Sequence, residues 1–130
     1  MRLNINDNTY VEIAEDVIKK IGEERNGKLQ FKLTTSKIRS ILAMNSAIYN
    51  EVVQNLSQKL DTKIKRDLQY LKVRLVYEAG RETAVKKFVE EANLLELLDT
   101  IGESKERYLL FSRYLEALVA YHRYYGGSDK

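Results

Sequence analysis

Apolar residues recur at intervals of three and four along most of the chain, which is the spacing that places them on one side of an α-helix. The first such segment follows Thr9, which with Glu12 has the spacing of a helix-capping box. Asn26-Gly27 closes this segment. The apolar positions that predict this first helix are Ile13, Ala14, Val17, Ile18 and Ile21.

Residues 28–33 break the pattern, because polar and apolar residues alternate there. Alternation has the period of a β-strand, but the sequence offers no recognisable partner strand. We therefore predict an extended connector whose Leu29, Phe31 and Leu33 contact the core.

The longest periodic segment follows possible capping residues at positions 34–36. Its apolar positions continue to Leu60, with one polar interruption at Asn45, and predict an amphipathic helix of about six turns. These positions are Ile38, Ile41, Leu42, Ile48, Tyr49, Val52, Val53, Leu56 and Leu60.

Further helices are predicted after residue 60. Asp61 can begin a third helix that Gly80 ends. A short fourth helix follows, and it either stops near Ala92 or continues to Ile101. Ser104 begins a last long helix, which Gly126-Gly127 ends. The sequence contains no proline and only six glycines, so we predict an all-α, single-domain bundle of five or six helices over residues 1–130.

Composition narrows the function classes. The 130 residues are 44% hydrophobic and 32% charged, which excludes a disordered chain and a membrane protein. No uncharged apolar run approaches the ~18 residues of a membrane span. The first residues lack the apolar segment of a signal peptide, so we expect a cytoplasmic protein. The absence of cysteine excludes disulfides, zinc–thiolate sites and cysteine nucleophiles, and a single histidine excludes most metal and acid–base schemes built on histidine pairs.

Charge is spread unevenly along the chain. Residues 34–81 hold nine Lys or Arg against four Asp or Glu, a net charge of +5, whereas residues 82–130 hold seven against nine. A basic middle region favours an anionic partner. Chance is the alternative, since a segment of this length reaches such a charge without a function.

Basic and aromatic residues of the third helix follow one face. Steps of three and four residues separate them, and the apolar row lies on another side of the helix. Cations at this pitch can follow a phosphate backbone, and tyrosine rings can stack on bases or sugars. The row consists of Lys59, Lys63, Arg66, Tyr70, Arg74, Tyr77 and Arg81.

Two further cations, Lys37 and Arg39, lie in the first turn of the second helix, where the helix dipole suits a phosphate. The alternative for the whole row is an ordinary solvated helix face, with Tyr70 and Tyr77 in contact with another helix or subunit.

The C-terminal segment carries four tyrosines between Tyr114 and Tyr125, together with His122. These side chains either form a stacking surface or, as we favour, fill the bundle or an oligomer interface. We interpret His122 as a hydrogen-bonded core residue. The sequence contains no phosphate-binding glycine loop, no metal-ligand pair and no distinctive carboxylate pair. We therefore expect no catalytic residues, no metal and no cofactor.

Three stretches resemble a known family. They are residues 33–39 (LTTSKIR), 71–81 (LKVRLVYEAGR) and 114–127 (YLEALVAYHRYYGG). Their order and spacing are similar to those of the small subunit of the type III-A CRISPR–Cas effector complex, the Csm complex. The resemblance covers residues 33–127 and leaves the N-terminal third unmatched.

The resemblance implies a helical, non-catalytic subunit in an antiviral RNA-guided complex. Several copies would lie beside the subunits that hold the guide RNA, brace the guide–target duplex and help to hold the target RNA. Cleavage would belong to other subunits. The family's basic inner-face residues correspond to Lys37, Arg39, Arg74 and Arg81. Lys59, Lys63 and Arg66 lie outside the matching stretches and are predicted to bind RNA from the helical row alone.

The expected partners are guide RNA, target RNA, the other subunits of the complex and further copies of the chain. Small helical bundles can exchange helices, so an isolated dimer can differ from the working form. The alternative function is a protein–protein adaptor that self-associates through its tyrosines and binds no nucleic acid.

Overall fold

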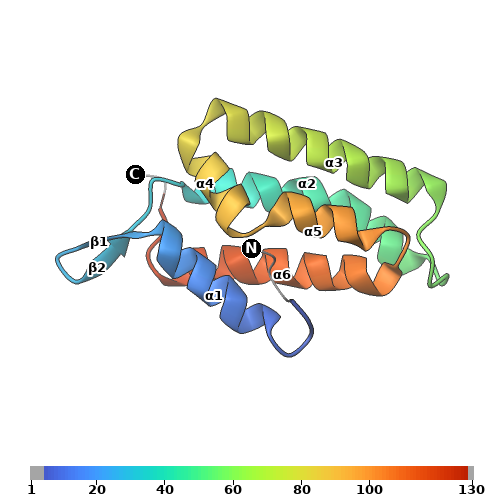
Figure 1. Ribbon diagram of the computed structural model, residues 1–130, viewed down its shortest axis with the longest axis horizontal. Coiled ribbons are helices and arrows are strands. Elements are labelled where there is room, and N and C mark those ends of the chain that lie inside the picture. The colour runs from blue at the N-terminus through green and yellow to red at the C-terminus, as the bar shows by residue number, and fades with distance from the viewer. Residues whose placement is uncertain (1–4, 129–130) are drawn as a thin grey trace.

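The computed structural model describes residues 5–128. Six helices and one small hairpin make up this part of the chain, which confirms the predicted all-α bundle (Figure 1). The elements are, in order, α1 (Tyr10–Ile21), β1 (Glu23–Arg25), β2 (Lys28–Gln30), α2 (Thr35–Gln54), α3 (Thr62–Arg81), α4 (Thr83–Glu91), α5 (Leu94–Ile101) and α6 (Lys105–Tyr124).

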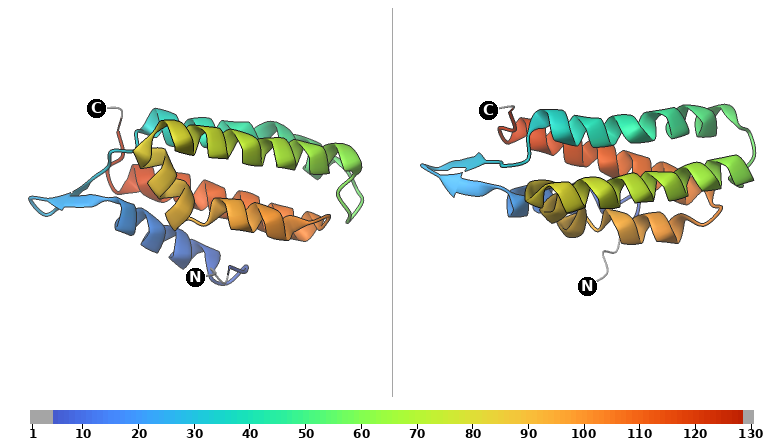
Figure 2. Two further views of the ribbon diagram at one scale, coloured as in Figure 1. Left: turned by 45° about the horizontal axis from the view of Figure 1, so that its top comes forward. Right: turned by 90° about the horizontal axis from the view of Figure 1, so that it is seen from above.

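The core forms where the apolar faces of the helices meet. Helix α6 contacts α1, α2 and α5, so it lies inside the bundle, whereas α3 lies along one outer edge against α2, α4 and α5 (Figures 1 and 2). Figure 2 shows the hairpin projecting from one end of the bundle. No helix among residues 5–128 has the length and apolar content needed to cross a membrane.

Three predicted helix starts are confirmed by their capping bonds. The side chain of Thr34 accepts a hydrogen bond from the Lys37 backbone N–H at 3.2 Å, and Asp61 accepts one from Ile64 at 2.8 Å. Ser104 caps α6 in the same way. These bonds satisfy N–H groups that have no partner within the helix.

The capping box predicted at Thr9 does not form. Thr9 is the N-cap residue of α1, but its side chain makes no capping bond. Its hydroxyl accepts instead from the Asn6 backbone N–H at 3.0 Å. The start of α1 was therefore predicted at the right residue through the wrong contact.

The prediction of an unpaired connector at residues 28–33 is wrong. Residues Lys28–Gln30 pair antiparallel with Glu23–Arg25 across the turn at Asn26-Gly27. Both turn residues have positive φ, at 53° and 78°, as a two-residue hairpin turn requires. Leu33 is buried and Phe31 packs on the core, as predicted, whereas Leu29, predicted with them, is only half-buried in β2.

Two helix ends also differ from the prediction. Helix α2 ends at Gln54 rather than near Leu60, and Leu56 in the following loop is 92% exposed. Helix α3 continues through Gly80 to Arg81. A left-handed residue, Asn93 with φ of 58°, separates α4 from α5, so the segment that could have been one helix is two.

Candidate nucleic-acid interface

Helix α3 owes its orientation to a single apolar row. Ile64, Leu68, Leu71 and Leu75 are all buried against the rest of the bundle. Burial of this row turns the opposite side of the helix toward solvent, because the side chains of a helix point radially from its axis. The predicted basic and aromatic row lies on that outer side.

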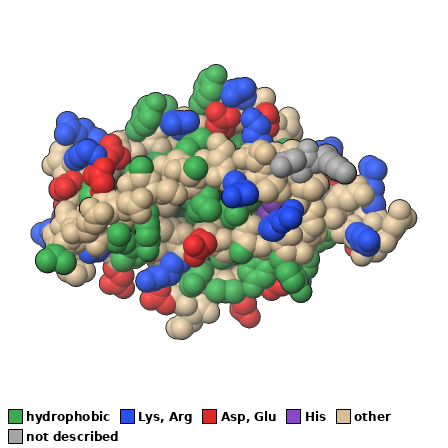
Figure 3. Space-filling model, turned by 180° about the vertical axis from the view of Figure 1, so that it is seen from behind, with side chains coloured by type: hydrophobic (Ala, Val, Ile, Leu, Met, Phe, Trp, Pro, Cys, Tyr) green, Lys and Arg blue, Asp and Glu red, His purple; other side chains and the backbone are tan. Residues whose placement is uncertain are grey.

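The outer side of α3 carries exposed aromatic and aliphatic side chains between its arginines. Tyr70, Val73 and Tyr77 are 63%, 60% and 62% exposed, and Arg66 and Arg74 are exposed beside them. Figure 3 shows hydrophobic side chains projecting from the upper edge of the molecule, where α3 lies, with charged side chains between them. We call these five residues the α3 outer surface.

Three of the seven predicted cations already have carboxylate partners. Lys63 lies 2.7 Å from Glu51 and 2.9 Å from Asp67, and these hydrogen bonds raise the pKa of its ammonium group. Arg81 lies 3.3 Å from Glu78, and its guanidinium also stands 5.5 Å from the centre of the Tyr77 ring. The third pair joins Lys37 and Glu82 at 3.2 Å.

The other four predicted cations have no carboxylate partner within residues 5–128. Arg66 and Arg74 belong to α3, and Arg39 belongs to the first half of α2. Lys59 does not share the helical row, because α3 begins at Thr62 and Lys59 lies in the loop before it, bridged to Ser104. The helix therefore gathers six of the seven row positions, not all seven.

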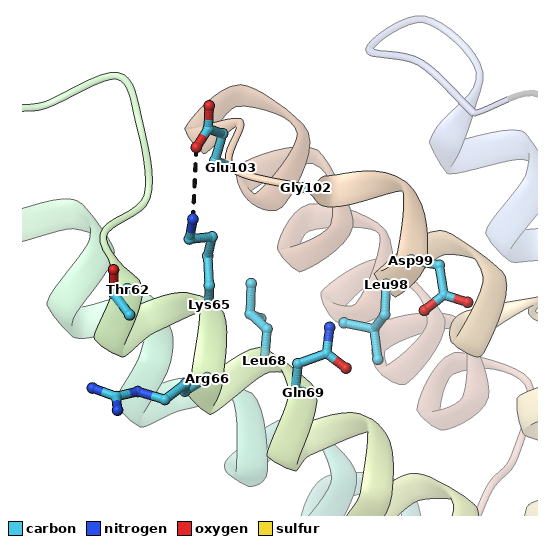
Figure 4. A pocket seen from close by; sticks show the side chains of 9 residues that line it. All are labelled: Thr62, Lys65, Arg66, Leu68, Gln69, Leu98, Asp99, Gly102 and Glu103. Carbon is cyan, nitrogen blue, oxygen red and sulfur yellow. Dashed lines mark ion pairs between the residues drawn. The ribbon is translucent and has the colours of Figure 1, made fainter.

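A cleft of about 490 Å³ lies between α3 and α5 (Figure 4). Lys65 and Glu103 form an ion pair across it at 3.6 Å, and Asp99 lies at its other end. Figure 4 shows that Arg66 points away from this pair. Ionic partners already occupy the cleft, and its lining offers no nucleophile–base pair.

Among residues 5–128 no three His, Cys, Asp or Glu side chains come together as a metal site would require. The most perturbed titratable groups are structural instead. Burial raises the pKa of Tyr108 to about 12 and raises that of Tyr114 as well. Burial and the nearby Arg123 lower the pKa of His122.

The C-terminal tyrosine segment mostly fills the bundle, as we favoured. Tyr114 is fully buried, and its hydroxyl donates to the Ala92 carbonyl at 2.9 Å. His122 is fully buried, and its Nε2 lies 2.8 Å from the Leu33 carbonyl, which confirms a hydrogen-bonded core histidine. Tyr124 is the exception, with 78% of its surface exposed.

A buried polar group that sequence reasoning did not identify joins α2 to α6. The Asn45 amide donates to the Ser112 hydroxyl at 3.0 Å and accepts from the Tyr108 hydroxyl at 2.7 Å. The only signal in the sequence was one polar residue interrupting an apolar row. Because all three groups have partners, this cluster fixes the packing of the two helices rather than marking a site.

Fold and surface together define a class of protein. It is a small helical bundle with an exposed basic and aromatic outer helix and, within residues 5–128, no assembled metal site. The family model for Csm2 of type III-A systems matches residues 10–128. The chain therefore belongs to the Csm2 family, the small subunits of the type III-A CRISPR–Cas effector complex, the Csm complex.

Similar relatives cover nearly the whole chain. The CRISPR system Cms protein Csm2 of Mycobacterium tuberculosis (strain CDC 1551 / Oshkosh) is 41% identical over 128 residues, which are 98% of this chain and 100% of that protein. The Csm2 protein of Streptococcus thermophilus is 42% identical over 125 residues, 96% of this chain and 98% of its own length. That of Enterococcus italicus is 37% identical over 99 residues, 75% of this chain and 71% of its own length.

These matches confirm the resemblance seen in the sequence and extend it. The family model begins at residue 10, so α1 and the hairpin belong to the family's region although their sequence alone matched nothing we recognised. The three stretches that carried the resemblance therefore did not reach the N-terminal third, although the family model matches most of it.

Proposed function

We propose that this chain is a non-catalytic small subunit that binds RNA through the α3 outer surface and braces the guide–target duplex. The observation that carries the proposal is the alternation of two unpaired arginines, Arg66 and Arg74, with two exposed tyrosines, Tyr70 and Tyr77. Arginine binds phosphate through several parallel N–H donors, and tyrosine rings stack on bases.

The geometry of the outer surface suits a strand of RNA rather than a single small anion. Arg66 and Arg74 lie two helical turns apart on α3, which corresponds to ~12 Å along the axis. Neither arginine forms an ion pair within residues 5–128, although each borders a cavity that carboxylates also line. Both guanidinium groups can therefore bind separate phosphates of one backbone.

The ion pairs divide the seven predicted RNA-binding cations into an unpaired and a paired group. Arg39, Lys59, Arg66 and Arg74 keep their full charge for a partner. Lys37, Lys63 and Arg81 are neutralised in part by Glu82, by Glu51 with Asp67, and by Glu78. We propose that the first four contribute most of the attraction to RNA, and that the other three mainly hold helices and side chains in place.

Self-association and contact with the other subunits form the second part of the proposal. Val53, Val73 and Val76 are 44%, 60% and 49% exposed. Aliphatic side chains of this kind contribute little to stacking with bases, but their burial under a protein surface is favourable. We propose that these three valines contact neighbouring protein subunits in the cytoplasm while the arginines of the α3 outer surface contact RNA.

The proposal is tested by reversing the two unpaired charges, Arg66→Glu and Arg74→Glu, in the assembled complex. We expect unchanged helicity and a loss of target-RNA retention that is largest at low salt and shrinks as the salt concentration rises, because fewer phosphate contacts give a shallower salt dependence. The matched control is Lys86→Glu with Lys87→Glu on α4, where both lysines are exposed and form no ion pair within residues 5–128. Equal retention by the two double variants would reject the α3 outer surface as an RNA contact and favour the adaptor function.

A further inference from the structure

The end of the bundle that carries the hairpin contains two adjoining cavities, which are separate from the α3 outer surface. A groove of about 980 Å³ lies between β2 and the end of α6. A pocket of about 400 Å³ lies between the start of α2 and the end of α6. Ser128 lines both cavities, so the C-terminal segment runs between them.

These two cavities differ from the others in charge. Asp99 and Glu103 line the cleft between α3 and α5, and carboxylates also line the cavities beside Glu116 and beside Glu51. Within residues 5–128, no carboxylate lines the groove or the pocket at the hairpin end. Their charged residues are all cations, so both attract an anion. These cations are Lys28 in the groove and Arg39 and Arg123 in the pocket.

The two arginines of the pocket are available to an anionic ligand. Neither has a carboxylate partner within residues 5–128. Arg123 donates one bond to the Gly127 carbonyl at 3.1 Å, which leaves its other N–H groups free to contact a ligand. The start of α2 at Thr35 lies in the same wall, so the positive end of a 20-residue helix adds to the attraction.

The pocket wall also contains two buried polar atoms without a partner in the described chain, Thr35 Oγ1 and His122 Nδ1. Buried polar atoms normally have a hydrogen-bond partner. His122 Nε2 donates to the Leu33 carbonyl, so Nδ1 is an acceptor. Both atoms are closed to solvent, and Gly127 covers Nδ1, since a Cβ at that position would lie 2.2 Å from it. The two arginines, and not these atoms, are therefore the groups of the pocket that a ligand can reach.

The groove adds a supported aromatic ring. Tyr124 is 78% exposed, and its ring stands edge-on to that of Tyr125, with centroids 5.0 Å apart. Tyr125 is fixed in turn, because its hydroxyl donates to Glu15 and its ring stacks with that of Tyr121. An exposed ring held from behind is the arrangement on which a base stacks.

We propose that the hairpin end binds single-stranded RNA, with a phosphate between Arg39 and Arg123 and a neighbouring base on Tyr124. The inference rests on the proposed RNA-binding function and adds a second contact surface to it. The phosphate donors of the pocket and the stacking ring of the adjoining groove match a nucleotide strand. An acidic peptide would use only the arginines.

The test measures the affinity of the assembled complex for target RNA over a range of salt concentrations. Arg39→Gln and Arg123→Gln together should reduce the log–log salt slope by about 0.7, since the two arginines bind one phosphate and each phosphate neutralised in a single strand contributes about 0.7. Arg39→Gln alone should remove part of this change. Tyr124→Ala should lower the affinity while leaving the slope unchanged. The control, Lys86→Gln with Lys87→Gln, removes the same charge from α4 and should leave both unchanged.

If Arg39→Gln has the same log–log salt slope as the control, the inference is overturned. It is also overturned if the variant subunit fails to enter the complex while the slope stays unchanged, because that result would indicate an acidic protein neighbour. The single variant keeps the test decisive if loss of the Arg123–Gly127 bond disturbs the C-terminal segment. The Arg66→Glu and Arg74→Glu variant separates the two proposals. If that variant weakens binding and Arg39→Gln does not, the hairpin end fails together with the rank given to Arg39, while the α3 outer surface stands. The reverse result rejects the α3 outer surface and leaves the hairpin end.

Discussion

Helices α3 and α6 are each 20 residues long and both carry tyrosines, yet most of these tyrosines are placed differently in the two helices. Tyr70 and Tyr77 on α3 are 63% and 62% exposed, whereas Tyr108 and Tyr114 on α6 are fully buried. Helix α6 has neighbours in α1, α2 and α5, while α3 lies at the outer edge (Figure 1). Tyrosines in the middle of the inner helix therefore fill the core, whereas those of the outer helix, like Tyr124 at the end of α6, lie in solvent.

Hydrogen bonding shows the same contrast. The hydroxyls of Tyr108 and Tyr114 donate to Asn45 and to the Ala92 carbonyl. Within residues 5–128 the hydroxyls of Tyr70 and Tyr77 have no such partner. Burying a hydroxyl without a partner costs free energy, so Tyr108 and Tyr114 of α6 are committed to the fold. Those of α3 remain available for a ligand.

The largest expected effect compares one tyrosine from each helix. Tyr114→Ala removes a fully buried ring and should lower the free energy of unfolding by about 3–5 kcal/mol. Tyr77→Ala should change it by less than about 0.5 kcal/mol, because the ring is mostly in solvent. Urea unfolding followed by circular dichroism measures both. Similar losses for the two variants would mean that α3 packs more tightly than its exposure indicates.

A second comparison uses the glycine near the end of each helix. A Cβ at position 127 would lie 2.1 Å and 2.2 Å from two ring atoms of His122, so Gly127→Ala should destabilise the fold by on the order of 1–3 kcal/mol. No atom outside the helix backbone lies within 4 Å of a Cβ at Gly80. Gly80→Ala should therefore stabilise α3 by roughly 0.5–1 kcal/mol. Thermal unfolding of the two variants gives the signs, and a neutral Gly127→Ala would contradict the close contact with His122.

The smallest expected effect is the pH dependence that His122 adds. Burial, and then Arg123, lower its pKa in the folded state, whereas in the unfolded chain the pKa is near 6.5. Below pH 6.5 the unfolded chain thus binds a proton that the folded chain does not, and stability falls as the pH falls. His122→Gln keeps an N–H donor for the Leu33 carbonyl and removes the titration. Its stability should decline less between pH 7 and 5.5 than that of the original chain, and equal declines would exclude this contribution.

The sequence was sufficient for the helices because each carries its own signals. Thr34, Asp61 and Ser104 cap helices through bonds to residues three positions later, which are local contacts. The hairpin was missed because its strands are three residues each, too short for alternation to indicate pairing. The turn residues Asn26-Gly27 were the available signal, and we interpreted them only as the end of a helix.

The outward face of α3 was likewise predicted correctly from its apolar row. Which of its cations form ion pairs was not predicted. Lys63 pairs with Glu51 of α2, 12 positions away, and Lys37 pairs with Glu82 across the bundle. Such partners depend on how the helices lie beside one another, which the spacing within one helix does not contain. Only the structure therefore separates the unpaired Arg66 and Arg74 from their paired neighbours.

The most direct test of the RNA-binding proposal is a crosslinking measurement at Tyr77. A photoreactive phenylalanine analogue replaces Tyr77 in the full chain, the complex is assembled with labelled target RNA, and adducts are identified after irradiation. The same analogue at Tyr49, which is 40% exposed on α2, is the control. We predict RNA adducts at position 77 and none at position 49. Adducts at position 77 that contain only protein would contradict the account and identify α3 as a protein-binding surface.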